Sequence, residues 1–87
     1  MVVVCIPTLL RQLTKGQDKV VVDGNTLGKV VDQLDESYPG LKSRLIVQGQ
    51  LKPSITASID GAFIRKGLYE RVNPDSEVTF LPNISGG

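Results

Sequence analysis

Two short apolar runs near the start of the chain predict a β-hairpin. The first, Val2–Ile6, is rich in β-branched residues and ends at Pro7, which is typical of a strand buried on both faces. The second, Lys19–Val22, follows a turn-like segment at Lys15–Asp18 and closes at Asp23-Gly24. We therefore expect two adjacent strands, with the first in the middle of a sheet.

The strongest helical pattern follows this hairpin. Thr26 is the expected N-cap, because its hydroxyl can accept a hydrogen bond from a free backbone N–H of the first turn. Gly28 lowers helix propensity by up to about 1 kcal/mol relative to Ala, but it would let another backbone approach closely. Pro39-Gly40 ends the helix. One apolar face recurs at helical spacing and consists of Leu27, Val30, Val31, Leu34 and Tyr38.

The middle of the second half predicts a further hairpin. We expect a short helical turn at Leu41–Leu45 and a loop over Val47–Ser54. Apolar and polar residues alternate through Ile55–Ile59, which indicates a half-buried strand. Asp60-Gly61 then predicts a tight turn into a returning strand at Ala62–Ile64.

The last strand completes the predicted topology. It is expected at Glu77–Leu81, after a turn at Asn73–Ser76, and Pro82 ends it by removing a ladder donor. A hairpin, a helix and then two or three strands predict an α+β fold of the β-grasp (ubiquitin-like) type. In this fold a mixed sheet packs on one main helix, with the final strand parallel to the first. We assign residues 1–82 to this domain and 83–87 to a flexible C-terminal tail.

Composition narrows the class of protein. With 87 residues, of which 40% are hydrophobic and 22% charged, the chain fits one ordinary globular domain. Its longest apolar run is too short for a membrane span or a signal peptide, so we expect a soluble, cytoplasmic protein. A net charge of +1 with scattered lysines gives no reason to expect nucleic-acid binding.

Side chains suited to catalysis are scarce. The chain has no histidine, the commonest general base and metal ligand, and no G-x-x-x-x-G-K-[ST] phosphate loop. A single cysteine, Cys5, excludes an internal disulfide, and its apolar strand predicts an inert core residue. The acidic residues Asp32, Asp35 and Glu36 fall on the polar side of the helix, where a solvated surface is the simplest interpretation. We expect no bound metal or cofactor, and no enzymatic activity of the chain itself.

The glycine pair Gly86-Gly87 at the end of the sequence is the most suggestive chemical feature. Glycine has no Cβ, so a carboxylate on such a tail can enter a gap of another protein that is closed to bulkier residues. That carboxylate, with a pKa near 3.5, is ionised at pH 7 and resists nucleophilic attack until it is activated. An incidental glycine pair is the alternative.

Several stretches resemble the small sulfur carriers of the ThiS/MoaD family. They cover nearly the whole chain, and the Ile-Pro-Thr-x-Leu-Arg opening resembles the branch that donates sulfur for cysteine biosynthesis. These stretches are Ile6–Arg11, Gly24–Val30, Tyr38–Leu41 with Arg44-Leu45, and Asp75–Pro82 followed by Ile84–Gly87.

The resemblance implies a reaction at the chain end. An E1-like adenylyltransferase would use Mg-ATP, which this chain does not bind itself, to convert the Gly87 carboxylate to an acyl-adenylate. A sulfur donor would then leave a thiocarboxylate. Gly86, Ser85 and Ile84 would thread the tail into the partner. The acceptor would be a cysteine synthase-like pyridoxal-phosphate enzyme or the large subunit of molybdopterin synthase, and a metallopeptidase is a further expected partner.

Three alternatives stay open at this point. The chain also resembles the molybdopterin synthase small subunit. A ubiquitin-like modifier joined to lysines through Gly87 would need the same activation. A β-grasp interaction domain with a dispensable tail is the third.

Partner docking is expected on the sheet face next to the tail. The apolar candidates are Phe63, Ile64, Leu68, Phe80 and Pro82, with Ile84 beyond the strand. Core packing is the favoured alternative for Phe63, Leu68 and Phe80. The basic residues Arg65, Lys66 and Arg71 could meet acidic side chains of an activating enzyme, although solvated surface charge is the commoner role.

Overall fold

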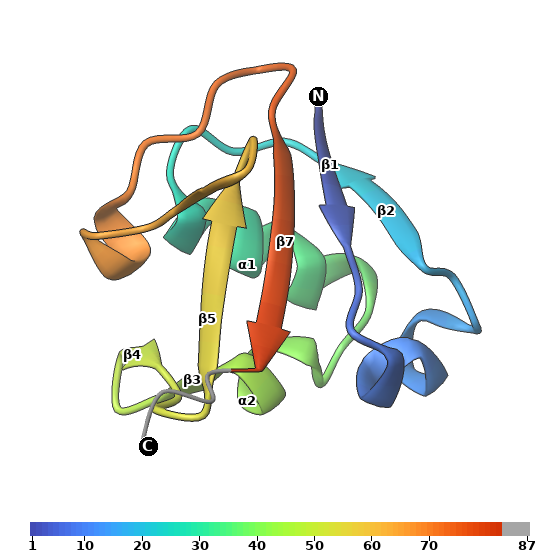
Figure 1. The fold of residues 1–87 in the computed structure, drawn as a ribbon. Helices are drawn as coiled ribbons and strands as arrows, with labels where there is room; N and C mark the ends of the chain where they lie inside the picture. The colour runs from blue at the N-terminus through green and yellow to red at the C-terminus, as the bar shows by residue number, and fades with distance from the viewer. Residues whose placement is uncertain (83–87) are drawn as a thin grey trace.

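The computed structural model describes residues 1–82 and has the predicted β-grasp architecture, with one mixed sheet packed on one main helix (Figure 1). Five strands form this sheet in the order β2-β1-β7-β5-β6. The elements are β1 (Val2–Cys5), a 3₁₀ helix η1 (Thr8–Thr14), β2 (Lys19–Val22), α1 (Leu27–Ser37), α2 (Leu41–Leu45), β3 (Ile46–Val47), β4 (Gln50–Leu51), β5 (Ile55–Ile59), β6 (Ala62–Phe63), a 3₁₀ helix η2 (Gly67–Tyr69) and β7 (Glu77–Pro82).

The first and last strands lie side by side at the centre of the sheet. β1 pairs antiparallel with β2 and parallel with β7, as the apolar pattern predicts. β7 also pairs antiparallel with β5, and the tight turn at Asp60-Gly61 returns the chain into β6. Both turn residues have positive φ (53° and 88°), as a two-residue hairpin turn requires.

Helix α1 covers one face of this sheet and encloses the core between them (Figure 1). The Thr26 hydroxyl accepts a hydrogen bond from the Lys29 amide at 3.2 Å, which confirms the predicted N-cap. Gly40, with φ of 105°, follows Pro39 and turns the chain into α2. The helical residues that are fully buried in the core are Leu27, Val30, Val31 and Leu34.

Gly28 performs the predicted role of a close-approach residue. A Cβ at this position would lie 3.3 Å from the Leu68 carbonyl oxygen in η2. The missing side chain therefore lets η2 pack against the first turn of α1. The Leu27 amide also donates to the Glu70 carbonyl oxygen at 2.9 Å, which holds the two segments together.

Two sequence-based expectations were wrong. β1 is not buried on both faces: Val2 and Val4 point into the core, but Val3 and Cys5 are only partly buried. The reason is that α1 covers only the inner face, and no described element covers the other. The segment Val47–Ser54 is not all loop, because β3 and β4 form a small antiparallel hairpin around Gln48 and Gly49, both at positive φ.

Candidate functional site

The described domain ends in β7, the middle strand of the five-stranded sheet. β7 is hydrogen-bonded to β1 on one side and to β5 on the other, and its last residue, Pro82, lies opposite Ile55. The pairing with β1 stops at Thr79, so the point from which the chain continues is held by β5 alone. The predicted reactive and threading residues, Gly87, Gly86, Ser85 and Ile84, lie outside the described residues.

The other end of β7 is anchored by the Asp60 carboxylate. It accepts hydrogen bonds from the Ser76 hydroxyl at 2.8 Å and from the Glu77 amide at 2.9 Å. These two bonds stabilise the charged form and hold the pKa of Asp60 below its usual value of 3.8. Asp60-Gly61 is thus more than a turn, because it ties the β5–β6 hairpin to the start of the central strand.

The candidate partner-binding residues have quite different surroundings. Phe80 is only 3% exposed and packs in the core, so the core alternative is confirmed for it. Phe63 is 66% exposed on the edge strand, and the core alternative was wrong there. Leu68, in η2, is half-buried against the core, whereas Pro82 is exposed at the end of β7.

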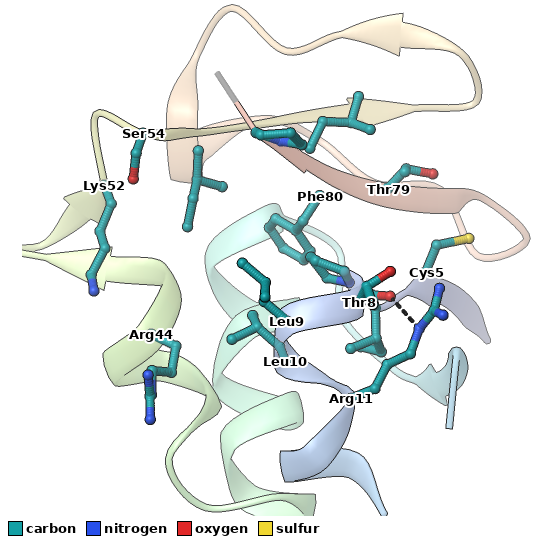
Figure 2. A pocket seen from close by; sticks show the side chains of 15 residues that line it. Cys5, Thr8, Leu9, Leu10, Arg11, Arg44, Lys52, Ser54, Thr79 and Phe80 are labelled. Atoms are coloured by element: carbon teal, nitrogen blue, oxygen red, sulfur yellow. Dashed lines mark hydrogen bonds between the residues drawn. The ribbon is translucent and has the colours of Figure 1, made fainter. Parts of the chain in front are cut away.

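A groove of about 760 Å³ lies where β7 ends. Its apolar surface includes Ile6, Leu10 and Phe80, and Pro82 forms part of its edge. Leu9, from η1, projects beside it and is 85% exposed (Figure 2). The groove therefore lies at the end of β7 from which the chain continues.

Three cationic side chains line the groove. Figure 2 shows Lys52 and Arg44 on one side, with Arg11 on the other. The Arg11 Nε donates to the Ile6 carbonyl oxygen at 3.1 Å, which fixes the guanidinium beside the groove. Among residues 1–82, neither Arg44 nor Lys52 has a salt bridge or a side-chain hydrogen bond, and no lining residue is acidic. Within the part of the chain that the structure describes, no carboxylate pairs with Arg44 or Lys52, so the groove is positively charged.

Cys5 is not the core residue that the sequence suggested. Its side chain lies partly exposed on the outer face of the sheet, and its Sγ donates to Glu77 Oε2 at 3.2 Å. Partial burial first, and then the hydrogen bond to a carboxylate, raise the pKa of the thiol above its usual value. Cys5 is consequently a poor nucleophile, because its thiol stays protonated at neutral pH.

The acidic side of α1 is only partly the solvated surface that was expected. Asp35 accepts hydrogen bonds from the amides of Gly40 and Lys42 and so connects α1 to α2. Asp32 pairs with the Lys42 ammonium at 2.7 Å. Within residues 1–82, no cluster of potential ligands could hold a metal ion, and no helix is long and apolar enough to cross a membrane.

The predicted basic surface consists of Arg65, Lys66 and Arg71, all exposed. The nearby Glu70 carboxylate accepts hydrogen bonds from the backbone amides of Arg65 and Lys66, at 2.8 and 2.9 Å. These bonds lower the pKa of Glu70. None of these three residues lines the groove at the end of β7.

Comparison with known proteins decides the family. The sequence model of the ThiS family matches residues 4–87. The chain belongs to the ThiS family. A relative from Mycobacterium bovis, "Sulfur carrier protein CysO", is 35% identical over 91 aligned positions, which cover 99% of this chain and 98% of the relative. ThiS-family membership with such relatives makes the protein a ubiquitin-like sulfur carrier.

Two further similar proteins bear on the function. A crystal structure of the Amycolatopsis orientalis BexX/CysO complex contains a chain that is 31% identical and matches over 100% of both chains, with a TM-score of 0.93. "Small archaeal modifier protein 3" of Haloferax volcanii is 30% identical over 69 residues, covering 77% of this chain and 75% of the relative. The sequence is thus similar both to a named sulfur carrier and to a named archaeal modifier.

Sequence reasoning missed the cationic groove. Arg11, Arg44 and Lys52 are far apart along the chain and come together only when η1, α2 and the segment after β4 meet. A partial signal did exist, because Ile6–Arg11 and Arg44-Leu45 are among the stretches that resemble the ThiS/MoaD family. That resemblance did not indicate that they share one surface.

Proposed function

We propose that the protein carries sulfur on the carboxyl group of Gly87, for use in cysteine biosynthesis. An E1-like adenylyltransferase activates this carboxylate with Mg-ATP. The carboxylate oxygen attacks the α-phosphorus of ATP and releases pyrophosphate. A sulfide-equivalent donor then attacks the acyl carbon, forms the C–S bond and expels AMP, which leaves a thiocarboxylate.

The observation that carries this proposal is the position of β7. The central strand leads directly from the rigid sheet into residues 83–87, and Pro82 is its last hydrogen-bonded residue. At roughly 3.3 Å per residue, this segment can reach about 16 Å beyond the domain. The folded body thus serves as a handle that a partner grips while the tail enters its active site.

The likeness to CysO supports cysteine biosynthesis as the receiving pathway. The acceptor would then be a cysteine synthase-like pyridoxal-phosphate enzyme in the cytoplasm. A metallopeptidase would release the product from the carrier. A molybdopterin synthase large subunit is the alternative acceptor, and a comparison of sulfur transfer to the two enzymes distinguishes them.

The test follows the intact mass of the protein. The chain is incubated with the activating enzyme of the same organism, Mg-ATP and a sulfide source. Formation of a thiocarboxylate should increase the mass by about 16 Da, because sulfur replaces oxygen. A chain that ends at Ser85 should show no such gain, and Gly86→Ala should slow the reaction because a methyl group obstructs a narrow channel. A normal gain by the chain ending at Ser85 would overturn the proposal.

Conjugation is the second candidate function, supported by the likeness to a small archaeal modifier protein. The same acyl-adenylate would then be attacked by a lysine amine, and an isopeptide-linked adduct would form instead of the thiocarboxylate. Mass spectrometry of the same reaction with added cell extract separates the two products.

A further inference from the structure

We propose that the cationic groove at the end of β7 binds an acidic segment of the partner protein that takes up the tail. This segment carries an apolar side chain among its carboxylates. This inference rests on the proposed function, since it concerns the surface that such a partner grips. Of the expected docking residues, the groove includes Phe80 and Pro82 but not Phe63 or Leu68.

Position is the first argument. The groove includes Pro82, and residues 83–87 span only about 16 Å when extended. A partner that buries the chain end must therefore lie against the surface around Pro82. The exposed sheet edge at Phe63 lies on β6, two strands away from β7.

Charge is the second argument. Arg11, Arg44 and Lys52 line the groove, and no carboxylate among its lining residues balances them. Cys5 also lines the groove, and the Glu77 carboxylate that accepts from its thiol pairs with Lys19 at 3.7 Å. Elsewhere among residues 1–82, Lys42 is paired with Asp32. Acidic side chains of a partner would relieve the uncompensated charge and accelerate association.

The apolar surface is the third argument. Leu9 is 85% exposed at the rim, and the groove is lined by Leu10, Ile55 and Phe80. A volume of about 760 Å³ accommodates one or two side chains of a partner segment. An apolar anchor surrounded by charge pairs is the usual arrangement of a protein interface. These features together indicate an acidic segment with an apolar anchor.

The first experiment measures binding directly. The probe is the capped hexapeptide Glu-Asp-Leu-Phe-Asp-Glu, titrated into the full chain and followed by the amide NMR signals at low salt. We expect shifts around Leu9, Arg11, Arg44 and Lys52, and none for the control peptide Gln-Asn-Leu-Phe-Asn-Gln. The double variant Arg44→Gln/Lys52→Gln should weaken binding about tenfold.

A matched variant controls for net charge. Arg65→Gln/Lys66→Gln removes the same two charges from a surface outside the groove, so its affinity should stay within about twofold of wild type. Equal weakening by the two double variants would show general attraction only and would overturn the proposal. Shifts confined to the sheet face would also overturn it, as would signs that a second copy or residues 83–87 fill the groove. A second copy would be indicated by self-association that is lost in Arg44→Gln/Lys52→Gln, the groove variant. Binding of residues 83–87 would be indicated if the groove variant shifts the NMR signals of the tail amides without peptide.

The second experiment separates this inference from the proposed function. ATP–pyrophosphate exchange is measured with the activating enzyme as the carrier concentration is varied. The groove variant should raise the carrier KM about tenfold with little change in kcat, because docking and not chemistry is affected. If wild type is adenylated but the groove variant has an unchanged KM, the groove is not the docking site and the function stands. If wild type is never adenylated while the peptide still binds, the proposed function fails and only the affinity of the groove for acidic segments stands.

Discussion

The two faces of the central sheet use the same strands for different purposes. On the inner face, Val4 lies between Val20 and Val78, all of them buried under α1. On the outer face, one residue from each strand forms a straight row across the sheet. This row is Lys19, Cys5, Thr79, Ser58 and Phe63.

The difference shows how stability and contact are divided in a small domain. Apolar area removed from water on the inner face contributes most of the folding energy. The outer row mixes charged, polar and aromatic side chains, which suits contact with water or a partner more than a core. Because side chains alternate along each strand, one residue can pack in the core while the next residue in the sequence faces water or a partner.

The largest expected effect comes from the same substitution on each face. Val78→Ala removes two buried methyl groups from a residue with no exposed area, so it should lower the free energy of unfolding by about 2–3 kcal/mol. Val21→Ala, at a position that is 51% exposed on the outer face, should cost about 0.5 kcal/mol or less. Urea denaturation of both variants measures the difference.

Similar costs at the two positions would contradict the division of roles. The proposed docking adds a further expectation, because Val78 does not line the groove. At a temperature where Val78→Ala is folded, its carrier KM in the adenylation assay should equal that of wild type within about twofold.

Periodicity explains why so much of the fold could be predicted. The spacing of Leu27, Val30, Val31 and Leu34 identifies the helix and its buried face, and the apolar runs identify β1, β2 and β7. Gly28 also predicts a close backbone approach, and the structure places the Leu68 carbonyl oxygen there. These features are local, so the residues themselves encode them.

The errors concern information that only the assembled fold contains. Val3 and Cys5 are as apolar as their neighbours, and nothing in Val2–Ile6 reveals that only one face of the sheet is covered. The groove depends on the meeting of three separate segments, whose individual charges are unremarkable. Only the family resemblance marked two of these segments in advance.

A smaller effect is expected at the polar contact that anchors β7. Two hydrogen bonds lower the pKa of Asp60, so its charged form stabilises the fold at pH values above the ordinary pKa of 3.8. This contribution should disappear as pH falls through the lowered pKa of the folded state. Asp60→Asn should therefore have a lower free energy of unfolding than wild type at pH 7. The difference in free energy of unfolding should become smaller below about pH 4.

The matched control is Asp75→Asn, in the turn just before β7. The Asp75 side chain makes no hydrogen bond or ion pair within residues 1–82, so this variant should follow the wild-type pH dependence. Chemical denaturation at a series of pH values tests both variants. A gap between wild type and Asp60→Asn that stays constant from pH 7 to pH 3 would show that the carboxylate charge is not what anchors the strand.

The smallest expected effect is on the reactivity of the Cys5 thiol, on the outer face of the sheet. Partial burial and the hydrogen bond to Glu77 raise the pKa of the thiol, whereas the charge of Lys19 lowers it. Alkylation by iodoacetamide at neutral pH should therefore be faster in Glu77→Gln and slower in Lys19→Gln than in wild type, because only the thiolate reacts. Cys5→Ala should leave thiocarboxylate formation within about twofold of wild type, since the thiol takes no part in the transfer. Loss of transfer in Cys5→Ala, with a normal free energy of unfolding, would instead make the outer face a second reactive surface.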